Sequence, residues 1–428
     1  QGTLCRFHSP MGCAQLCCRK RQPDDGELML GDCGSTFEVK PSVGTWFLAK
    51  PKLVLDVETF GRSPQDACWG DYGWIRRRND EWARHTRREI SALTLRAIDT
   101  AGYTFRGSHQ VMLQHIAQTV LGTRIVSPTT GDWPDGGWLR HRSRTQASRE
   151  RAAPTSVTAM DLTVLETATY RVRQGVKHVV AVSAASAYHA GGGFETGGRH
   201  ALEEAFCVQS TLYPSLRQMV LRAREIGVAP PPWVSDAGLR ECHIPDDGAI
   251  LSPLVEVFRR GSNEGYPFED EAVTLEAVVS VAMPNCNPRV SDSPLDSRPD
   301  PEHYAKQLQQ KWRAVLTATA CYTQARCIVI PDAGCGVFQN PPAKVGAALG
   351  HVLGAEFAGC FDEVILSFPR GPSINECEFV VACRQALSGQ QQLDVVPHEK
   401  ARPQAASAPE VGWFPSLCSY LTIDSTGD

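Results

Sequence analysis

Continuous apolar runs and helix-spaced apolar positions alternate along the middle of the chain. Residues 178–187 and 327–331 are apolar runs with the length and composition of buried strands. Similar runs predict further strands at residues 250–258, 274–283 and 363–368. Strands that alternate with helices predict an α/β sandwich around a central sheet.

Helices are predicted between these strands. The first begins near Asp80, a capping residue that is followed by an acidic first turn. It places Ile90, Leu93 and Ala97 on one face, and Gly102 is expected to end it. The same apolar spacing predicts the remaining helices at residues 160–174, 205–221, 304–322, 344–357 and 374–387.

The two ends of the chain lack this pattern. Residues 1–78 are rich in Gly, Pro and Cys, and residues 389–428 are rich in Gln, Pro, Ala and Ser. We therefore expect a poorly ordered leader at 1–78, one folded domain at 79–388 and a disordered tail at 389–428. The leader crowds Cys5, His8, Cys13, Cys17, Cys18 and Cys33. A zinc site is conceivable there, but paired Cys-x-x-Cys spacings are missing, so free thiols are the preferred interpretation.

The net charge and the hydropathy of the chain argue against two classes of protein, general nucleic-acid binders and membrane-spanning proteins. The formal net charge of −4 argues against a general nucleic-acid binder. No apolar run is long enough to span a membrane. We therefore expect no membrane partner. We also expect a monomer, and the compartment stays open, with the cytoplasm or the nucleus favoured.

A glycine loop and two carboxylates follow the strand at 178–187. Gly191, Gly192 and Gly193 come first, and Glu203 and Glu204 then open the next helix. Three glycines allow the backbone to pass very close to a ligand, and amides between a strand end and a helix start suit a diphosphate. A carboxylate at that helix start can act on a bond held by the same loop. The alternative is that the two acids only stabilise the helix dipole.

A second glycine loop follows the strand at 327–331. It consists of residues 334–338, and Pro341 and Pro342 after it suit the first turn of a helix. Ligands of α/β folds bind at the carboxyl ends of strands, where both glycine loops fall. Together these features indicate a site that binds a phosphorylated sugar and performs acid chemistry on it.

Both loops resemble signatures of the bacterial-type poly(ADP-ribose) glycohydrolases, a macrodomain family. The first resembles the family's Gly-Gly-Gly, spacer, Gln-Glu-Glu pattern, and the second its Gly-Cys-Gly-Val-Phe loop, which wraps the diphosphate. Residues 87–90, 252–259 and 282–285 also resemble family segments, in the family's order. The resemblance implies a macrodomain-like α/β/α sandwich with a central mixed sheet and a helical N-terminal extension.

The resemblance also implies roles for individual residues. Glu204 would be the general acid/base, with a pKa raised by its neighbouring carboxylate and the diphosphate, and Glu203 would hold ribose hydroxyls. Phe338 would pack on the terminal ribose, although an ordinary core position is equally open. The full set expected to bind substrate is Gly191, Gly192, Gly193, Phe194, Ser183, Gly334, Cys335, Gly336, Val337 and Phe338.

The chain departs from the family at three positions. Leu202 stands where the family has Gln, Ser183 where it usually has Asn, and Ala190 where it usually has Pro. The first two changes remove amide groups that could contact a ribose, and the third should loosen the loop. A slow hydrolase, an altered substrate or a binder that no longer cleaves all remain open.

The function implied is hydrolysis of ribose–ribose O-glycosidic bonds in poly(ADP-ribose), which releases ADP-ribose without a metal or cofactor. The expected partners are poly(ADP-ribose) or ADP-ribosylated macromolecules. The alternatives are a non-catalytic ADP-ribose reader and a mono-ADP-ribosyl hydrolase that acts on modified protein or nucleic acid. A metal-dependent DEDD exonuclease is a weaker alternative, because Asp56 and Glu58 lack a convincing set of later acids.

Overall fold

The computed structural model describes residues 79–134, 155–228, 242–290, 293–369 and 371–389, and three short strands besides. These strands are Leu55–Asp56 (β1), Trp233–Ser235 (β7) and Gly238–Arg240 (β8). The chain divides into two compact units, residues 1–42 and 43–428, and every described residue belongs to the second. Apart from β1, the predicted leader with its cysteine cluster lies outside the described residues, as does the predicted tail after Gly389.

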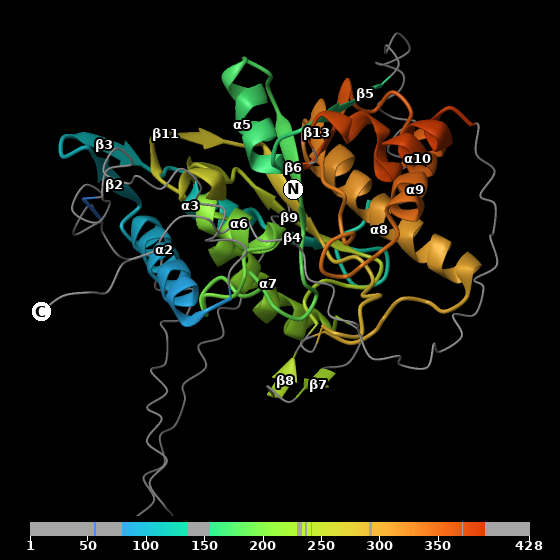
Figure 1. Cartoon of the computed structure of the whole chain (residues 1–428), viewed down its shortest axis with the longest axis horizontal. Helices are drawn as coiled ribbons and strands as arrows, with labels where there is room; N and C mark the ends of the chain where they lie inside the picture. The colour runs from blue at the N-terminus through green and yellow to red at the C-terminus, as the bar shows by residue number, and fades with distance from the viewer. Residues whose placement is uncertain are drawn as a thin grey trace, which may run out of the picture. The chain divides into compact units, whose positions relative to one another are not determined.

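A seven-stranded mixed sheet forms the centre of the domain (Figure 1). Five neighbouring strands, β12, β6, β13, β14 and β5, are parallel, and β9 lies antiparallel between β12 and β4. In sheet order the strands are Arg124–Val126 (β4), Ala249–Pro253 (β9), Ala277–Val281 (β12), Val179–Ala184 (β6), Cys327–Ile330 (β13), Glu363–Ser367 (β14) and Ser156–Met160 (β5).

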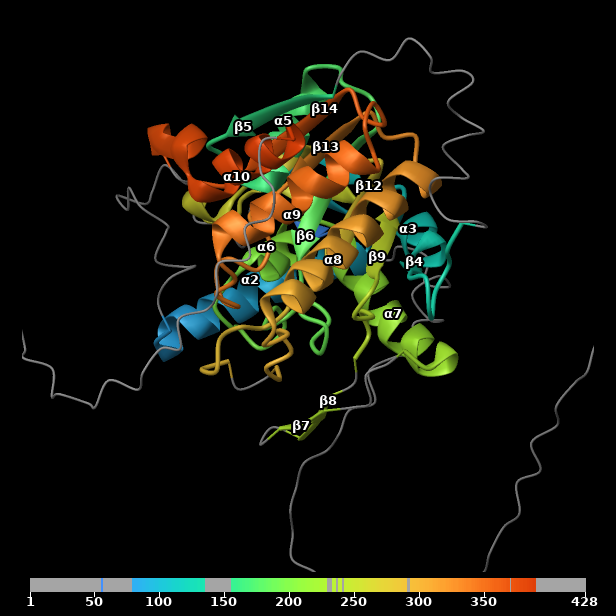
Figure 2. The same cartoon turned by 90° about the vertical axis from the view of Figure 1, so that its right-hand side faces the viewer.

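Helices cover both faces of this sheet (Figure 2). Val180 and Val182 of β6 pack in one core with Trp312, whereas the alternate residue Ala181 packs in a second core with Phe206. The first face is covered by Pro301–Tyr322 (α8), Pro342–Ala355 (α9) and Glu378–Leu387 (α10), and the second by Val164–Arg173 (α5), Leu202–Gln209 (α6) and Leu212–Ile226 (α7). The predicted α/β/α sandwich with a mixed sheet is therefore confirmed.

The helical N-terminal extension is Glu81–Asp99 (α2), whose cap Asp80 accepts a hydrogen bond from the Ala83 amide at 3.0 Å. The helix ends at Thr100, and Ala101 takes the left-handed conformation with φ 53°, so Gly102 opens the next strand instead of ending the helix. Smaller elements follow: the hairpin Gly102–Phe105 (β2) and His109–Met112 (β3), the helix Ile116–Gly122 (α3), and the antiparallel pair Glu256–Arg259 (β10) and Phe268–Thr274 (β11).

Three predicted elements are interrupted in the structure. The helix expected at 205–221 is two helices, α6 and α7, because Ser210 has an extended backbone and its hydroxyl donates to the Phe206 carbonyl at 2.6 Å. The strand expected at 250–258 is broken at Leu254, whose φ is 52°, so that β9 and β10 belong to different sheets. The helix expected at 374–387 is a 3₁₀ turn, Gly371–Glu376 (η3), followed by α10.

Two boundaries also differ. Residues 156–160 form the edge strand β5, and α5 begins only after it, at the reciprocal cap between Thr163 and Glu166. The strand expected at 274–283 begins at Ala277, because Thr274 ends β11. None of the described helices is both long enough and apolar enough to cross a membrane.

Candidate active site

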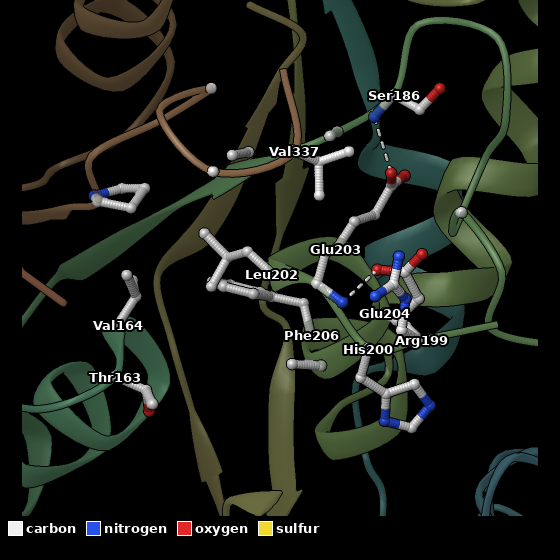
Figure 3. Close-up of a pocket in the computed structure, with 18 of the residues that line it drawn as sticks. Thr163, Val164, Ser186, Arg199, His200, Leu202, Glu203, Glu204, Phe206 and Val337 are labelled. Atoms are coloured by element: carbon white, nitrogen blue, oxygen red, sulfur yellow. Dashed lines mark hydrogen bonds between the residues drawn. The ribbon is translucent and has the colours of Figure 1, made fainter. Parts of the chain in front are cut away.

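A cavity of about 920 Å³ opens where the parallel strands end (Figure 3). Its walls come from the end of β6, the first glycine loop, the start of α6 and the second glycine loop. Eight of the predicted site residues line it: Gly192, Gly193, Glu203, Glu204, Gly334, Gly336, Val337 and Phe338. The structure thus brings together two segments that lie more than a hundred residues apart in the sequence.

Four other predicted residues lie outside the lining of this cavity. Phe194 is fully buried, with its ring centroid 4.7 Å from that of Tyr213, and Gly191 packs on the same tyrosine ring. Ser183 is fully buried within β6, before the strand ends. Cys335 is half-buried and packs against the core. The structure therefore places Phe194 and Ser183 in the protein interior and not in the cavity wall.

Glu203 ties the first glycine loop to the end of β6. Its Oε2 accepts from the Ser186 amide at 2.7 Å and its Oε1 from the Gly191 amide at 2.8 Å. The side chain is almost fully buried. Burial, followed by the negative charge of Glu204, raises the pKa of Glu203 well above its ordinary value, although the two amide hydrogen bonds oppose this rise.

Glu204, the third residue of α6, is held by two backbone amides. Its Oε1 accepts from Gly193 at 2.8 Å and its Oε2 from Ala201 at 2.9 Å. Gly192 has a φ of 55°, and a Cβ at that position would overlap Oε1 of Glu204. Glycine is therefore required at position 192 both for its backbone conformation and for the space that the carboxylate fills.

Helix α2 holds the far side of the same loop. The buried Arg87 donates from Nε to the Gly197 carbonyl at 2.9 Å, and Ser91 donates to the Phe194 carbonyl at 2.7 Å. Neither residue was predicted to belong to the site. The signal that could have found Arg87 is its place in the family-like segment 87–90.

In the second glycine loop, the backbone carbonyl groups accept hydrogen bonds from neighbouring residues. The Gly334 carbonyl accepts from Asn340 Nδ2 at 2.9 Å, the Val337 carbonyl from Asn287 Nδ2 at 2.8 Å, and the Phe338 carbonyl from the Cys286 amide at 2.9 Å. The amides of residues 336–338 form no hydrogen bond with another described residue. Consecutive unused amides in a cavity wall are the donors that bind phosphate groups.

Asn340 is the centre of this arrangement and was also missed. It is almost fully buried, accepts from the Tyr304 hydroxyl at 2.6 Å and donates to the Pro284 carbonyl at 2.8 Å, in addition to its bond to Gly334. Met283, Pro284 and Asn285 belong to the family-like segment 282–285, so the hydrogen bond to Pro284 gives that segment a structural role. Asn340 thus fixes the second loop to the end of β12.

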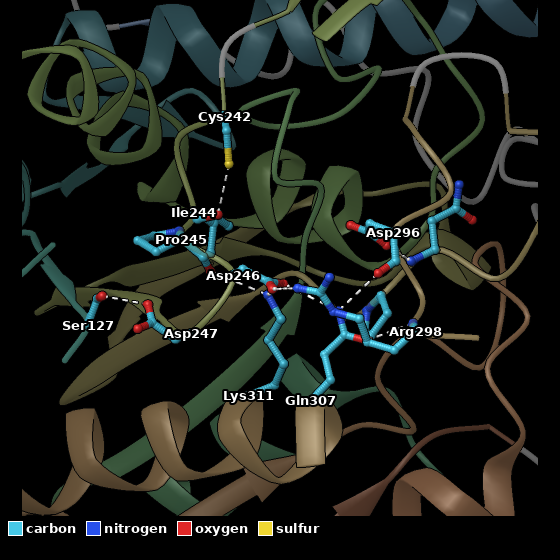
Figure 4. Close-up of polar contacts among 12 residues, drawn as sticks. Ser127, Cys242, Ile244, Pro245, Asp246, Asp247, Asp296, Arg298, Gln307 and Lys311 are labelled. Carbon is cyan, nitrogen blue, oxygen red and sulfur yellow. Dashed lines mark hydrogen bonds and ion pairs between the residues drawn. The ribbon is translucent and has the colours of Figure 1, made fainter. Parts of the chain in front are cut away.

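A partly exposed ionic network supports the remaining wall (Figure 4). Lys311 of α8 is buried, and its Nζ lies 3.3 Å from Oδ1 of Asp246, whose Oδ2 lies 3.2 Å from Arg298. Gln307 donates to the Asp296 carbonyl at 3.0 Å, and the side chain of Asp296 accepts from the Asn285 amide. The network joins residues 285–298 to α8, and this segment contributes Val290 and Ser293 to the cavity.

The mixed sheet between two helix layers, with both glycine loops at strand ends around one cavity, defines a macrodomain-type domain. Residues 91–260 match the family model of the microbial-type PARG catalytic domain. None of the curated proteins matches the chain.

Similar solved structures come from Thermomonospora curvata. The poly(ADP-ribose) glycohydrolase of this organism bound to the inhibitor ADP-HPD is 27% identical, covers 69% of this chain and 99% of its own, and has a TM-score of 0.51. A second structure of that enzyme is 26% identical, covers 72% of this chain and 100% of its own, and has a TM-score of 0.50. These comparisons confirm the predicted resemblance and the predicted enzyme class.

Proposed function

We propose that this site hydrolyses the ribose–ribose O-glycosidic bonds of poly(ADP-ribose) and releases ADP-ribose, with Glu204 as general acid/base. One observation carries the proposal: the Glu204 carboxylate is held at the start of α6 in the same cavity as the unused amides of residues 336–338. The first feature supplies proton transfer and the second supplies donors for a diphosphate.

The cavity suits a ligand of this size and chemistry. Its volume of about 920 Å³ lies in the range of small-molecule sites. The similar T. curvata structure binds the inhibitor ADP-HPD. In the proposed complex, the second loop binds the diphosphate of the terminal unit, and the distal ribose lies beside the two glutamates.

The two carboxyl groups provide one proton for the reaction. The raised pKa of Glu203, caused in part by the charge of Glu204, lets the pair keep a proton at a pH where an isolated carboxyl group would be ionised. We propose that this proton passes through Glu204 to the leaving oxygen as the ribosyl C–O bond breaks. A water molecule then attacks the oxocarbenium-like centre and returns its proton to Glu204.

A non-catalytic reader is the second candidate. It is favoured by Leu202, which places an apolar side chain in the cavity wall directly before the acid pair, and by Ser183, which lies outside the cavity lining. Such a protein would bind ADP-ribose through the second loop and leave the polymer intact.

Incubation of the whole chain with poly(ADP-ribose) tests the proposal, with free ADP-ribose as the product measured and the Glu204→Gln variant as the control. We expect release by the wild type alone. No release, together with a rise in melting temperature on adding ADP-ribose, would identify a reader. Release of ADP-ribose from singly modified protein or nucleic acid, but not from polymer, would identify a mono-ADP-ribosyl hydrolase.

We also propose that residues 79–388 are the catalytic domain, flanked by a leader at 1–78 and a tail at 389–428, and that the protein acts as an intracellular monomer in the cytoplasm or nucleus. Limited proteolysis tests the boundaries, because cleavage should stop near residues 79 and 388. Light scattering of the purified chain tests the monomer, and cell fractionation tests the compartment.

A further inference from the structure

Arg199 is an exposed arginine in the wall of the cavity, next to the proposed general acid. It lies in the loop between the three glycines and α6, and Figure 3 shows its side chain beside Glu204. Among the described residues it has no ion-pair partner. A guanidinium in this position has its charge available for a ligand.

The backbone on both sides of Arg199 is fixed. The Gly198 amide donates to the Gly193 carbonyl at 2.8 Å, and the Arg199 carbonyl accepts from the Ala201 amide at 3.1 Å. Arg87 binds the carbonyl of Gly197. The base of the side chain is therefore held at the rim of the cavity, at a constant place relative to Glu204.

A second exposed arginine lies near the loop that carries Arg199. Gly197 packs against the backbone of Arg84 on α2, so this exposed arginine lies next to the same loop. After burial, the positive charges of Arg84 and Arg199 both contribute to lowering the pKa of Arg87. We call Arg84 and Arg199 the arginine rim.

On the basis of the function proposed above, the chemistry of the leaving group indicates which ligand the arginine rim would bind. The leaving oxygen must lie beside Glu204, because it takes its proton from that carboxyl group. In a polymer this oxygen belongs to another ADP-ribose unit, which carries its own diphosphate and extends away from Glu204. Arginine presents several donors in a planar group that matches phosphate oxygens.

We propose that the arginine rim, with Arg199 as its principal member, binds the diphosphate of the leaving ADP-ribose unit. This is a second anion site, distinct from the second glycine loop, which takes the diphosphate of the terminal unit. It makes Arg199 a specificity-determining residue that favours polymer over substrates whose leaving group carries no diphosphate.

A binding experiment in the Glu204→Gln background tests this site without cleavage. The probes are ADP-ribose and the ADP-ribose dimer, which differ by one leaving unit. We expect the dimer to bind more tightly than ADP-ribose, and Arg199→Ala to weaken the dimer by about threefold to tenfold with ADP-ribose unchanged. Arg199→Lys should restore part of the difference, and added salt should reduce it. Arg222→Ala, an exposed arginine of α7 away from the cavity lining, is the matched control.

Each other outcome overturns the proposal. An unchanged preference for the dimer in Arg199→Ala would show that the leaving unit binds elsewhere. An equal loss for ADP-ribose and dimer would show that Arg199 contacts the terminal unit. If the Glu204→Gln protein binds neither probe, both the arginine rim and the proposed function are refuted. If the wild type hydrolyses the polymer but the Glu204→Gln protein shows no preference for the dimer, only the arginine rim is refuted.

Discussion

The two glycine loops differ in whether the protein itself binds their backbone amides. In the first loop, the amides of Gly191 and Gly193 donate to the protein's own carboxylates, Glu203 and Glu204. In the second loop, the carbonyls of Gly334, Val337 and Phe338 are bound by neighbouring residues, and the amides of residues 336–338 are left in the cavity wall.

This difference separates two tasks. The first loop uses its donors to hold the two carboxylates, so the contribution that we propose for it is the position of these side chains. The second loop leaves its donors for a ligand, and the contribution that we propose for it is affinity for a diphosphate. A run of glycines therefore predicts that the backbone passes close to another group. The hydrogen-bond partners of the loop determine whether its amides face a ligand or the protein's own side chains.

The largest effect should follow from Glu204→Gln. The substitution keeps the shape of the side chain and removes its titrating proton, so kcat should fall by about a hundredfold or more. The affinity for ADP-ribose should change far less, because the second loop is intact. Turnover of radiolabelled polymer and calorimetric binding of ADP-ribose measure the two quantities. Wild-type turnover should persist in EDTA; its abolition by the chelator would contradict the mechanism.

Replacing one glycine of each loop with alanine compares the two loops directly. Gly192→Ala forces a Cβ onto Oε1 of Glu204, so kcat should fall by about tenfold to a hundredfold through misplacement of the acid. Gly336→Ala is the matched change in the second loop, because its Cβ would meet no protein atom within 4 Å. We expect its melting temperature and kcat to stay close to wild type, and any loss to fall on the affinity for ADP-ribose. Equal kcat values for the two variants would show that Gly192 does not position Glu204.

Asn340→Ala tests the anchor of the second loop. It removes the side-chain hydrogen bonds to the Gly334 and Pro284 carbonyls and to the Tyr304 hydroxyl, which should lower the melting temperature and weaken ADP-ribose binding by about threefold to tenfold. Saturating kcat should change less than the dissociation constant. Tyr304→Phe removes one of these bonds and should have a smaller effect on both. A fall in kcat at unchanged affinity would assign Asn340 to the acid side of the cavity.

Leu202→Gln should have a smaller effect, in the opposite direction. Leu202 is half-buried in the cavity wall, and Figure 3 shows it on the side of Val164 and Val337. A net hydrogen bond of about 0.5–1.5 kcal/mol to the ribose or the loop would raise the rate by a few-fold to about tenfold. Leu202→Met, which adds no hydrogen-bonding group of this kind, is the control. Lower activity at an unchanged melting temperature would show that this site contacts ribose differently from the family.

The titration of Glu203 should show the smallest change. Nuclear magnetic resonance of labelled glutamate should give a midpoint above 4.5, and Glu204→Gln should lower it, because one of the two causes of the rise is removed. Since the folded state keeps the proton longer, this group makes the free energy of unfolding fall as pH rises from 4.5 to the folded pKa. That fall should be smaller in Glu204→Gln. A midpoint at or below 4.5 in the wild type would show that the amide bonds outweigh burial.

The sequence predicted the parts of the site that local patterns encode. β6 and β13 are continuous apolar runs, and each leads directly into its glycine loop, so both loops could be placed at strand ends. The order of the two glutamates at the start of α6 was equally visible. The edge strand β5 was not predicted, because its five residues are only partly buried and show no apolar run.

The contacts that fix the loops could not be predicted in the same way. Arg87 and Gly197 are 110 residues apart in the sequence, and Asn340 and Pro284 are 56 residues apart. Neither hydrogen bond therefore leaves a local sequence pattern. The bend at Leu254 uses a left-handed conformation without glycine or asparagine, which gives no signal in the sequence. Ser183 lies one residue before the end of β6, and its full burial comes from long-range packing that no local sequence pattern records.

The close approach of Glu204 to Gly192 has a consequence for the evolution of this chain. Position 192 must stay small for as long as position 204 carries a carboxylate, because the two groups would occupy one volume. A descendant that lost the acid would no longer be penalised in this way for a side chain at 192. The inference runs one way, because the left-handed backbone at 192 favours glycine even without the acid: a side chain at 192 in a related sequence indicates a lineage that no longer depends on the acid.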